Sequence, residues 1–358
     1  MVNYSEFREE VEQARLLEEG QEFLLEEEEL APTMSRIIEL SDDSYPAPGK
    51  EEERCTNPSG VGVWSQETMK IVHNLIEAAK SIGDQVRSEQ VIGPSSVSKV
   101  LQHIINQNLV EELYEYSMIN LKDMDVISRH SVIVTLISLM IGKGMDYDPK
   151  MQLVLGLSAF FSNVGMYKIP DDILNSKEKL GKGEKKIIRD HPMAAHDILK
   201  NVEKRYQWLS EIALQVHERS DGSGYPKGLN GKEINPLASI IGLVDLYVEM
   251  ISDRPYRDKV DQTDAIKYIV NEAKDFFPRK VRKVFLDQVT LFPINCYVIL
   301  NNQSIGRVLR TNKKWTLRPT VELLFNSQGD KLEPPRVLRL MENPLLYIKG
   351  SVDPNDLP

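Results

Sequence analysis

The segment HERSDGSGYPKGL, residues 217–229, lies between two apolar stretches, and the rest of the chain is interpreted from it. Three glycines and one proline punctuate this segment, at Gly222, Gly224, Gly228 and Pro226. Glycine permits positive φ angles and proline stops a helix, so the segment is predicted to be a shaped loop. The loop would present the side chains of Glu218, Asp221 and Tyr225, and loops of this kind commonly hold a ligand.

Apolar residues recur at helical spacing on both sides of this loop. The first such pattern consists of Met69, Val72, Leu75 and Ile76. Further helices are predicted over 97–109, 149–161, 184–199, 208–216, 237–251, 263–276 and 279–289, with another that contains His130. The fold class is therefore predicted to be mainly α, with a helical bundle as its body.

The pattern changes after Phe292, where short alternating stretches replace the helical spacing. These stretches are CYVIL (296–300), IGRVLR (305–310), PTVELLF (319–325) and RVLRLM (336–341), and polar turn residues separate them. Alternation with a period of two is typical of half-buried strands. A small C-terminal β-meander is therefore predicted.

Four regions are predicted along the chain. They are an acidic arm (1–58), an N-terminal helical module (59–118), a helical bundle (119–290) and a β tail (291–358). The arm contains four consecutive glutamates at 26–29, and like-charge blocks bury too little apolar surface to offset the entropy of ordering. We expect much of the arm to be mobile, either as a solvated tail or as a segment that docks on a partner.

Composition excludes several classes of function. The net charge of −10 and pI near 5.3 argue against a general DNA or RNA binder, which needs excess Lys and Arg. The apolar runs 132–142 and 151–161 are too short to span a bilayer, and the N-terminus lacks the cationic start of a signal peptide. Cys55 and Cys296 form no CxxC pair, which indicates a reducing compartment. A cytoplasmic protein without a membrane is predicted.

The loop and the segment ISDRPYR (251–257) together resemble the signature motifs of the HD-GYP phosphodiesterases. The matching loop residues are His217, Glu218, Asp221, Gly222, Gly224, Tyr225 and Pro226. The resemblance extends from about His130 to about Arg257 and has a weaker counterpart in the C-terminal tail. It implies a bacterial signalling protein with an HD-superfamily helical bundle that binds two or three metal ions and hydrolyses cyclic di-GMP.

The resemblance also assigns the metal ligands, and part of the set is changed in this chain. Residues of the expected type stand at His130, His191, His217 and Asp245. The His-Asp pair falls on Ser162 and Asn163, the first member of the His-His pair on Val216, and a phosphate-contacting lysine on Met166. The expected binuclear centre therefore lacks its bridging carboxylate and two imidazoles.

These changes predict a degenerate metal site. Hydrolysis of a phosphodiester needs a metal-activated water and cationic stabilisation of the transition state, and an amide is a weak substitute for a bridging carboxylate. One weakly held ion could join His130, Asn163 and Asp245, or Asp245 could form a dry pair with His130. The surviving histidines could equally be buried, hydrogen-bonded residues. Iron or manganese is therefore expected at reduced stoichiometry, or not at all.

Nucleotide binding is implied at Tyr225, Arg254 and Arg257, because arginine pairs with phosphate through two parallel donors. The alternative is that DRPYR is a helix stop with surface salt bridges. The preferred hypothesis is a catalytically inactive or impaired protein that acts as a cyclic di-GMP receptor, or as a scaffold whose glycine-rich loop engages signalling proteins. A working metal-dependent phosphodiesterase with a rearranged site and a purely structural interaction protein are the alternatives.

Overall fold

The computed structural model of the chain describes residues 64–121, 124–253, 260–289, 292, 294, 296–312, 315, 317–352 and 357–358. The chain divides into two compact units at the junction of Val289 and Thr290, and each is described here by itself. The predicted acidic arm, Cys55, Arg254 and Arg257 lie outside the described residues.

The helical unit begins with three helices, α3 (Gln66–Arg87), α4 (Ser95–Asn106) and α5 (Val110–Asn120). Helix α3 starts at Ser65, whose side chain accepts a hydrogen bond from the backbone N–H of Thr68 and satisfies one unpaired donor of the first turn. Val72, Leu75 and Ile76 of the predicted apolar face are buried, whereas Met69 is 40% exposed. Helices α3 and α5 pack on α6, and α4 packs on α7, within one compact unit.

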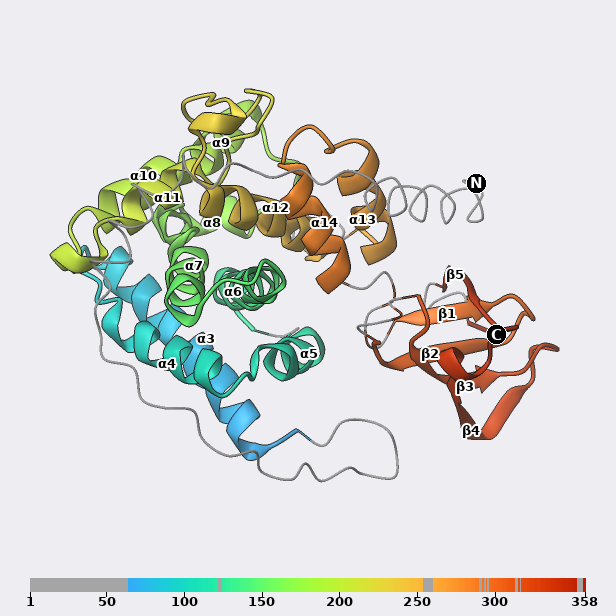
Figure 1. The fold of residues 1–358 in the computed structure, drawn as a ribbon. Coiled ribbons are helices and arrows are strands. Elements are labelled where there is room, and N and C mark those ends of the chain that lie inside the picture. Colours follow the sequence, from blue (N-terminus) through green and yellow to red (C-terminus); the bar gives the residue numbers. More distant parts are fainter. Residues whose placement is uncertain are drawn as a thin grey trace. The chain divides into compact units, whose positions relative to one another are not determined.

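Helix α6 (Val126–Gly144) occupies the middle of the helical unit, among α3, α5, α7, α12 and α14 (Figure 1). The side chain of Asp125 caps it by accepting a hydrogen bond from the N–H of Ser128 at 2.8 Å. Helix α6 is long and apolar enough to cross a membrane, although the shorter run 132–142 did not indicate this. However, 83% of its apolar 18-residue window is buried inside the protein. A core helix of a soluble protein has this composition.

The chain then continues through α7 (Pro149–Phe161), η2 (Val164–Lys168), α8 (Asp171–Leu174), α9 (Lys182–Arg189) and α10 (His191–Leu199). The sequence predicted one helix over 184–199, but the structure divides it into α9 and α10 at Asp190. Pro192 explains the division, because it has no N–H to continue the hydrogen-bond ladder of the preceding helix. The break lets His191 begin a new helix, which packs against η2.

The last part of the helical unit contains η3 (Lys204–Tyr206), α11 (Leu209–Gln215), η4 (Gly231–Glu233), α12 (Pro236–Ile251), α13 (Gln262–Asn271) and α14 (Arg279–Gln288). Helix α12 is capped by Asn235, whose side chain accepts from the N–H of Leu237, and it packs on α6 and α7. The glycine-rich segment joins α11 to α12. The prediction of a mainly α bundle is confirmed.

The second unit is a five-stranded antiparallel sheet in the order β4-β3-β2-β1-β5. Its strands are β1 (Tyr297–Leu300), β2 (Ile305–Arg310), β3 (Thr320–Phe325), β4 (Lys331–Arg339) and β5 (Ile348–Val352). The first four form the predicted meander, although β4 begins five residues before the stretch read from the sequence. Strand β5 was not predicted; it pairs with β1 and places Ser351 opposite Val298.

Candidate functional site

Five side chains that the sequence singled out are buried in the helical unit, each on a different element. They are His130 on α6, Asn163 after α7, His191 on α10, His217 after α11 and Asp245 on α12. Hydrogen bonds join them in two parts inside an apolar core, and Nδ1 of His217 in one part lies 3.9 Å from Oδ2 of Asp245 in the other. We call this group the polar cluster.

Asp245 is the central acceptor of the polar cluster. Its Oδ1 accepts a hydrogen bond from Nε2 of His130 at 2.8 Å and another from Nδ2 of Asn163 at 2.7 Å. The other ring nitrogen of His130, Nδ1, is buried and has no hydrogen-bond partner. Asp245 and His130 therefore form a buried hydrogen-bonded pair, and Asn163 adds a second donor to the same oxygen.

His191 and His217 form the second part of the polar cluster. Nδ1 of His191 donates to the carbonyl of Ile188 at 2.7 Å, which leaves its Nε2 as an acceptor in the neutral ring. Nε2 of His217 lies 3.0 Å from that atom, so it is the donor of the pair. Nδ1 of His217 lies 3.9 Å from Oδ2 of Asp245, so the two parts of the cluster are neighbours.

Burial and neighbouring charges set the protonation of the polar cluster. Burial, with smaller contributions from His191 and Arg219, lowers the pKa of His217 to about 3, so its ring is neutral at pH 7. Burial by itself would raise the pKa of Asp245, but the hydrogen bonds from His130 and Asn163 outweigh it and hold the pKa below its usual range. The cluster therefore contains an ionised carboxylate and a neutral imidazole.

Glu218 shapes the glycine-rich loop from inside. Its buried carboxylate accepts from the backbone N–H of Lys227 at 2.7 Å and of Leu229 at 2.9 Å, so it ties the two ends of the loop together. Gly222 has a φ of +78°, as expected for a tight turn. A Cβ at Gly224 would overlap the backbone of Glu218, so only glycine fits this close approach.

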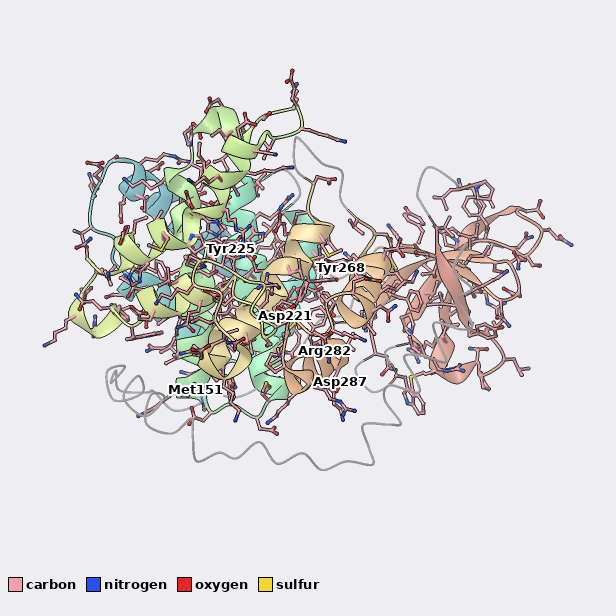
Figure 2. All side chains as sticks on the ribbon, turned by 90° about the horizontal axis from the view of Figure 1, so that it is seen from above. Met151, Asp221, Tyr225, Tyr268, Arg282 and Asp287 are labelled. Carbon is pink, nitrogen blue, oxygen red and sulfur yellow. The ribbon has the colours of Figure 1, made fainter. Side chains whose placement is uncertain are left out.

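Asp221 and Tyr225 have different surroundings, and Figure 2 labels them at separate positions. Asp221 is exposed and accepts from the N–H and hydroxyl of Ser223, which lowers its pKa and closes a local turn. The ring of Tyr225 is stacked on that of His217, with centroids 4.9 Å apart and an angle of 8° between their planes. Asp221 is therefore a turn residue, whereas Tyr225 adjoins the polar cluster.

Two arginines that the sequence analysis did not single out adjoin the site. The guanidinium of Arg189 lies 4.4 Å from the ring centre of Tyr225. Arg219 lies over the ring of Phe277 at 4.8 Å and donates to the carbonyls of Val216 and Glu218. The sequence signal for Arg189 was its position two residues before His191, at the end of a basic helix.

The substituted positions are buried as apolar or self-bonded side chains. Met166 and Val216 are both buried, and the hydroxyl of Ser162 donates to the carbonyl of Ala159 at 2.8 Å. Among the described residues no three His, Cys, Asp or Glu side chains are placed to hold a metal ion. Because Asn163 points an N–H donor at Asp245 where a binuclear centre needs a second anionic ligand, the donor set does not fit two metal ions.

Comparison with known families agrees with this architecture. Residues 114–281 match the family described as HD domain, and residues 297–358 match the family described as KOW domain associated with HD domain. The HD domain match lies in the helical unit, and the match to the associated domain lies in the β-sheet unit. The resemblance to the HD-GYP phosphodiesterases that was inferred from the loop is confirmed.

The chain is similar to several curated proteins. It is 27% identical over 288 residues to Cyclic di-GMP phosphodiesterase PA4108 of Pseudomonas aeruginosa, a match that covers 79% of this chain and 69% of that protein. It is 27% identical to Cyclic di-GMP phosphodiesterase PdeB of Borreliella burgdorferi, over 50% of this chain and 47% of that protein. A third relative is Cyclic di-GMP phosphodiesterase response regulator RpfG of Xanthomonas campestris, at 33% identity over 36% of this chain and 34% of that protein.

One solved structure has a similar fold. It is Bd1817, a HDG"Y"P protein from Bdellovibrio bacteriovorus, with a TM-score of 0.50 and 18% identity, over 74% of this chain and 80% of that one. At this identity the likeness shows the fold alone. The phosphodiesterases of the HD domain family depend on metal ions.

Proposed function

We propose that this protein is a cyclic di-GMP receptor of the HD-GYP type whose hydrolytic activity is lost or strongly impaired, and that it acts in the cytoplasm. The proposal draws its ligand from the relatives, which are named as cyclic di-GMP phosphodiesterases. It draws the loss of activity from the polar cluster. In this function the glycine-rich loop would also be the surface that engages a signalling protein.

The observation that carries the proposal is the 2.7 Å hydrogen bond from the amide of Asn163 to Asp245. A carboxylate at this position would supply negative charge and lone pairs to two dications, but an amide nitrogen supplies a proton donor. The bond occupies Oδ1 of Asp245, which His130 also uses. A cluster whose members bond to one another has little capacity to hold two metal ions and activate water.

The features that support binding are the loop and its aromatic residue. Glu218 holds the backbone of Lys227 and Leu229, so the loop is ordered before a ligand arrives. The ring of Tyr225 lies between the ring of His217 and the guanidinium of Arg189, so its edge and hydroxyl are the parts that would contact a ligand. Arg254 and Arg257 remain expected phosphate contacts from the resemblance.

The experiment measures binding and turnover on the same preparation. Titration calorimetry with cyclic di-GMP should give a saturable signal, while chromatography of the incubated nucleotide should detect no product. The double variant Ser162→His with Asn163→Asp restores the family pair and should raise iron or manganese content above that of the wild type. Turnover by the wild type that disappears in Asp245→Ala would overturn the proposal, and a flat titration would leave only an interaction protein.

A second candidate is an active phosphodiesterase with a rearranged metal site. The observation in its favour is that His130, His191, His217 and Asp245 all survive and meet in one buried cluster. Elemental analysis of protein purified without chelator or oxygen separates the two candidates. Two ions per chain would favour the enzyme, whereas a substoichiometric trace or none is expected for the receptor.

A further inference from the structure

Four basic residues occupy one face of helix α9. They are Lys182, Lys185, Lys186 and Arg189, which stand at positions i, i+3, i+4 and i+7. Residues at this spacing are neighbours on a helix surface, so the four cations form a stripe along α9. All four are exposed, in a chain whose net charge is −10. We call them the α9 stripe.

The charges of the α9 stripe are not neutralised within the described part of the chain. None of the four side chains forms an ion pair with a carboxylate of the described residues. The nearest acidic residue on the helix, Glu184, instead accepts from the backbone N–H of Gly181 at 2.6 Å and caps the first turn. The helix dipole favours Lys186 and Arg189 in the last turn, but like charges at this spacing repel one another and Lys182 and Lys185 lie outside that turn.

Helix α9 contributes nothing to the apolar core. None of its side chains is buried, and Ile187 is 43% exposed. The stripe therefore has no packing role that would explain its residues. Its C-terminal member, Arg189, immediately precedes the junction with α10, where the site residue His191 begins the next helix.

Arg189 connects the α9 stripe to the site. Its guanidinium lies 4.4 Å from the ring centre of Tyr225, and that ring is stacked on His217 of the polar cluster. A guanidinium over an aromatic ring is held by cation–π attraction while its N–H groups at the edge remain free to donate. Among the described residues no hydrogen bond from these N–H groups is present.

We infer that the α9 stripe is a phosphate-binding subsite beside Tyr225, in which Arg189 pairs with a phosphate of a cyclic dinucleotide. The inference rests on the proposed receptor function and adds a residue and a surface to it. Arg189 supplies a planar, bidentate contact, and the three lysines raise the local concentration of the anionic ligand.

The test is titration calorimetry of the full chain with cyclic di-GMP, comparing Arg189→Gln with the wild type. Losing one charge-assisted contact should weaken binding roughly tenfold to a hundredfold, and Arg189→Lys should recover only part of the loss. The matched control is Arg205→Gln, because Arg205 also lies over a tyrosine, Tyr206 at 4.8 Å, but pairs with Glu203. The control should bind like the wild type.

The lysines are tested through the salt dependence of the affinity. The triple variant with Lys182, Lys185 and Lys186 changed to Gln should bind more weakly at low salt and lose less affinity as salt is added. Equal affinity and equal salt dependence in all variants would overturn the inference while leaving the receptor function intact. A flat titration with the wild type would instead overturn the receptor function and the inference together.

Discussion

Replacing a carboxylate oxygen by an amide nitrogen reverses the direction of a hydrogen bond, and Asn163 does this inside the helical unit. Its Nδ2 donates to Asp245, which also accepts from His130. Oδ1 of this carboxylate therefore accepts from two protein donors. The residue-scale predictions follow from this arrangement.

Asp245→Ala should destabilise the helical unit by about 3 kcal/mol, because it leaves the donors of His130 and Asn163 buried and unpaired. Urea unfolding followed by far-UV circular dichroism measures the change. Asp197→Ala, on the exposed side of α10, is the control and should change the free energy of unfolding by less than about 0.5 kcal/mol. Equal values for the two variants would show that the Asp245 hydrogen bonds contribute little.

Acid should destabilise the protein through His217. Its pKa is lowered to about 3 in the folded state, whereas an unfolded histidine titrates near 6.5. Between these values the unfolded chain binds the extra proton, so stability is lost as pH falls below about 6.5. At pH 5 the loss should be about 2 kcal/mol relative to neutral pH.

The measurement is urea unfolding of chelator-treated protein at the two pH values. His217→Gln should remove most of the decrease in the free energy of unfolding that this residue causes at pH 5, because glutamine does not titrate. His103→Gln is the matched control, since His103 is on the surface beside Glu67 at 2.9 Å. An unchanged pH dependence in His217→Gln would contradict the buried, neutral imidazole.

At the scale of elements, the polar cluster depends on the close approach of η2 to α10. A Cβ at Gly165 would overlap the carbonyl of His191 and lie 2.6 Å from the backbone nitrogen of Ala195. Both atoms belong to backbone, so neither can move without shifting α10. The glycine therefore sets how near His191 comes to the other members of the cluster.

Gly165→Ala should destabilise the helical unit by about 3 kcal/mol and displace His191, because overpacking against backbone forces a shift. Thermal unfolding measures the first effect, and the ring signals of His191 in NMR report the second. Gly183→Ala on α9 is the control, since nothing lies within 4 Å of its added Cβ. That variant should be neutral or stabilising by up to about 1 kcal/mol. Two equally stable variants would mean that η2 and α10 are not tightly packed.

At the scale of the whole molecule, the helical unit is held together by a large apolar core, and the polar cluster satisfies most of its own hydrogen bonds. Prolonged dialysis against chelator should therefore leave its cooperative unfolding intact and shift the midpoint by no more than a few degrees. Circular dichroism melts with and without chelator measure this. Loss of the cooperative transition after dialysis would show that a bound ion stabilises the fold.

The domain order was predictable from sequence because it depends on local patterns. Helical spacing, the capping residues and the alternation after Phe292 each act over a few residues, and the structure confirms the helical bundle and the meander. Strand β5 was not predicted because its sequence, IKGSV, contains a glycine and two polar residues, which are uncommon in strands. The sequence signal for the division of α9 from α10 is Pro192, which has no N–H to continue the preceding helix.

The sequence by itself, through its resemblance to the HD-GYP phosphodiesterases, predicted which residues stand at the ligand positions: the histidines and Asp245 as retained, and Ser162, Asn163 and Val216 as substituted. Only the tertiary structure decided how the survivors pair, since His130 and Asp245 are 115 residues apart and meet through the packing of α6 on α12. It also placed Arg189 over Tyr225, a contact between distant segments. Sequence spacing fixes neighbours on one helix, but contacts between elements depend on how the helices pack.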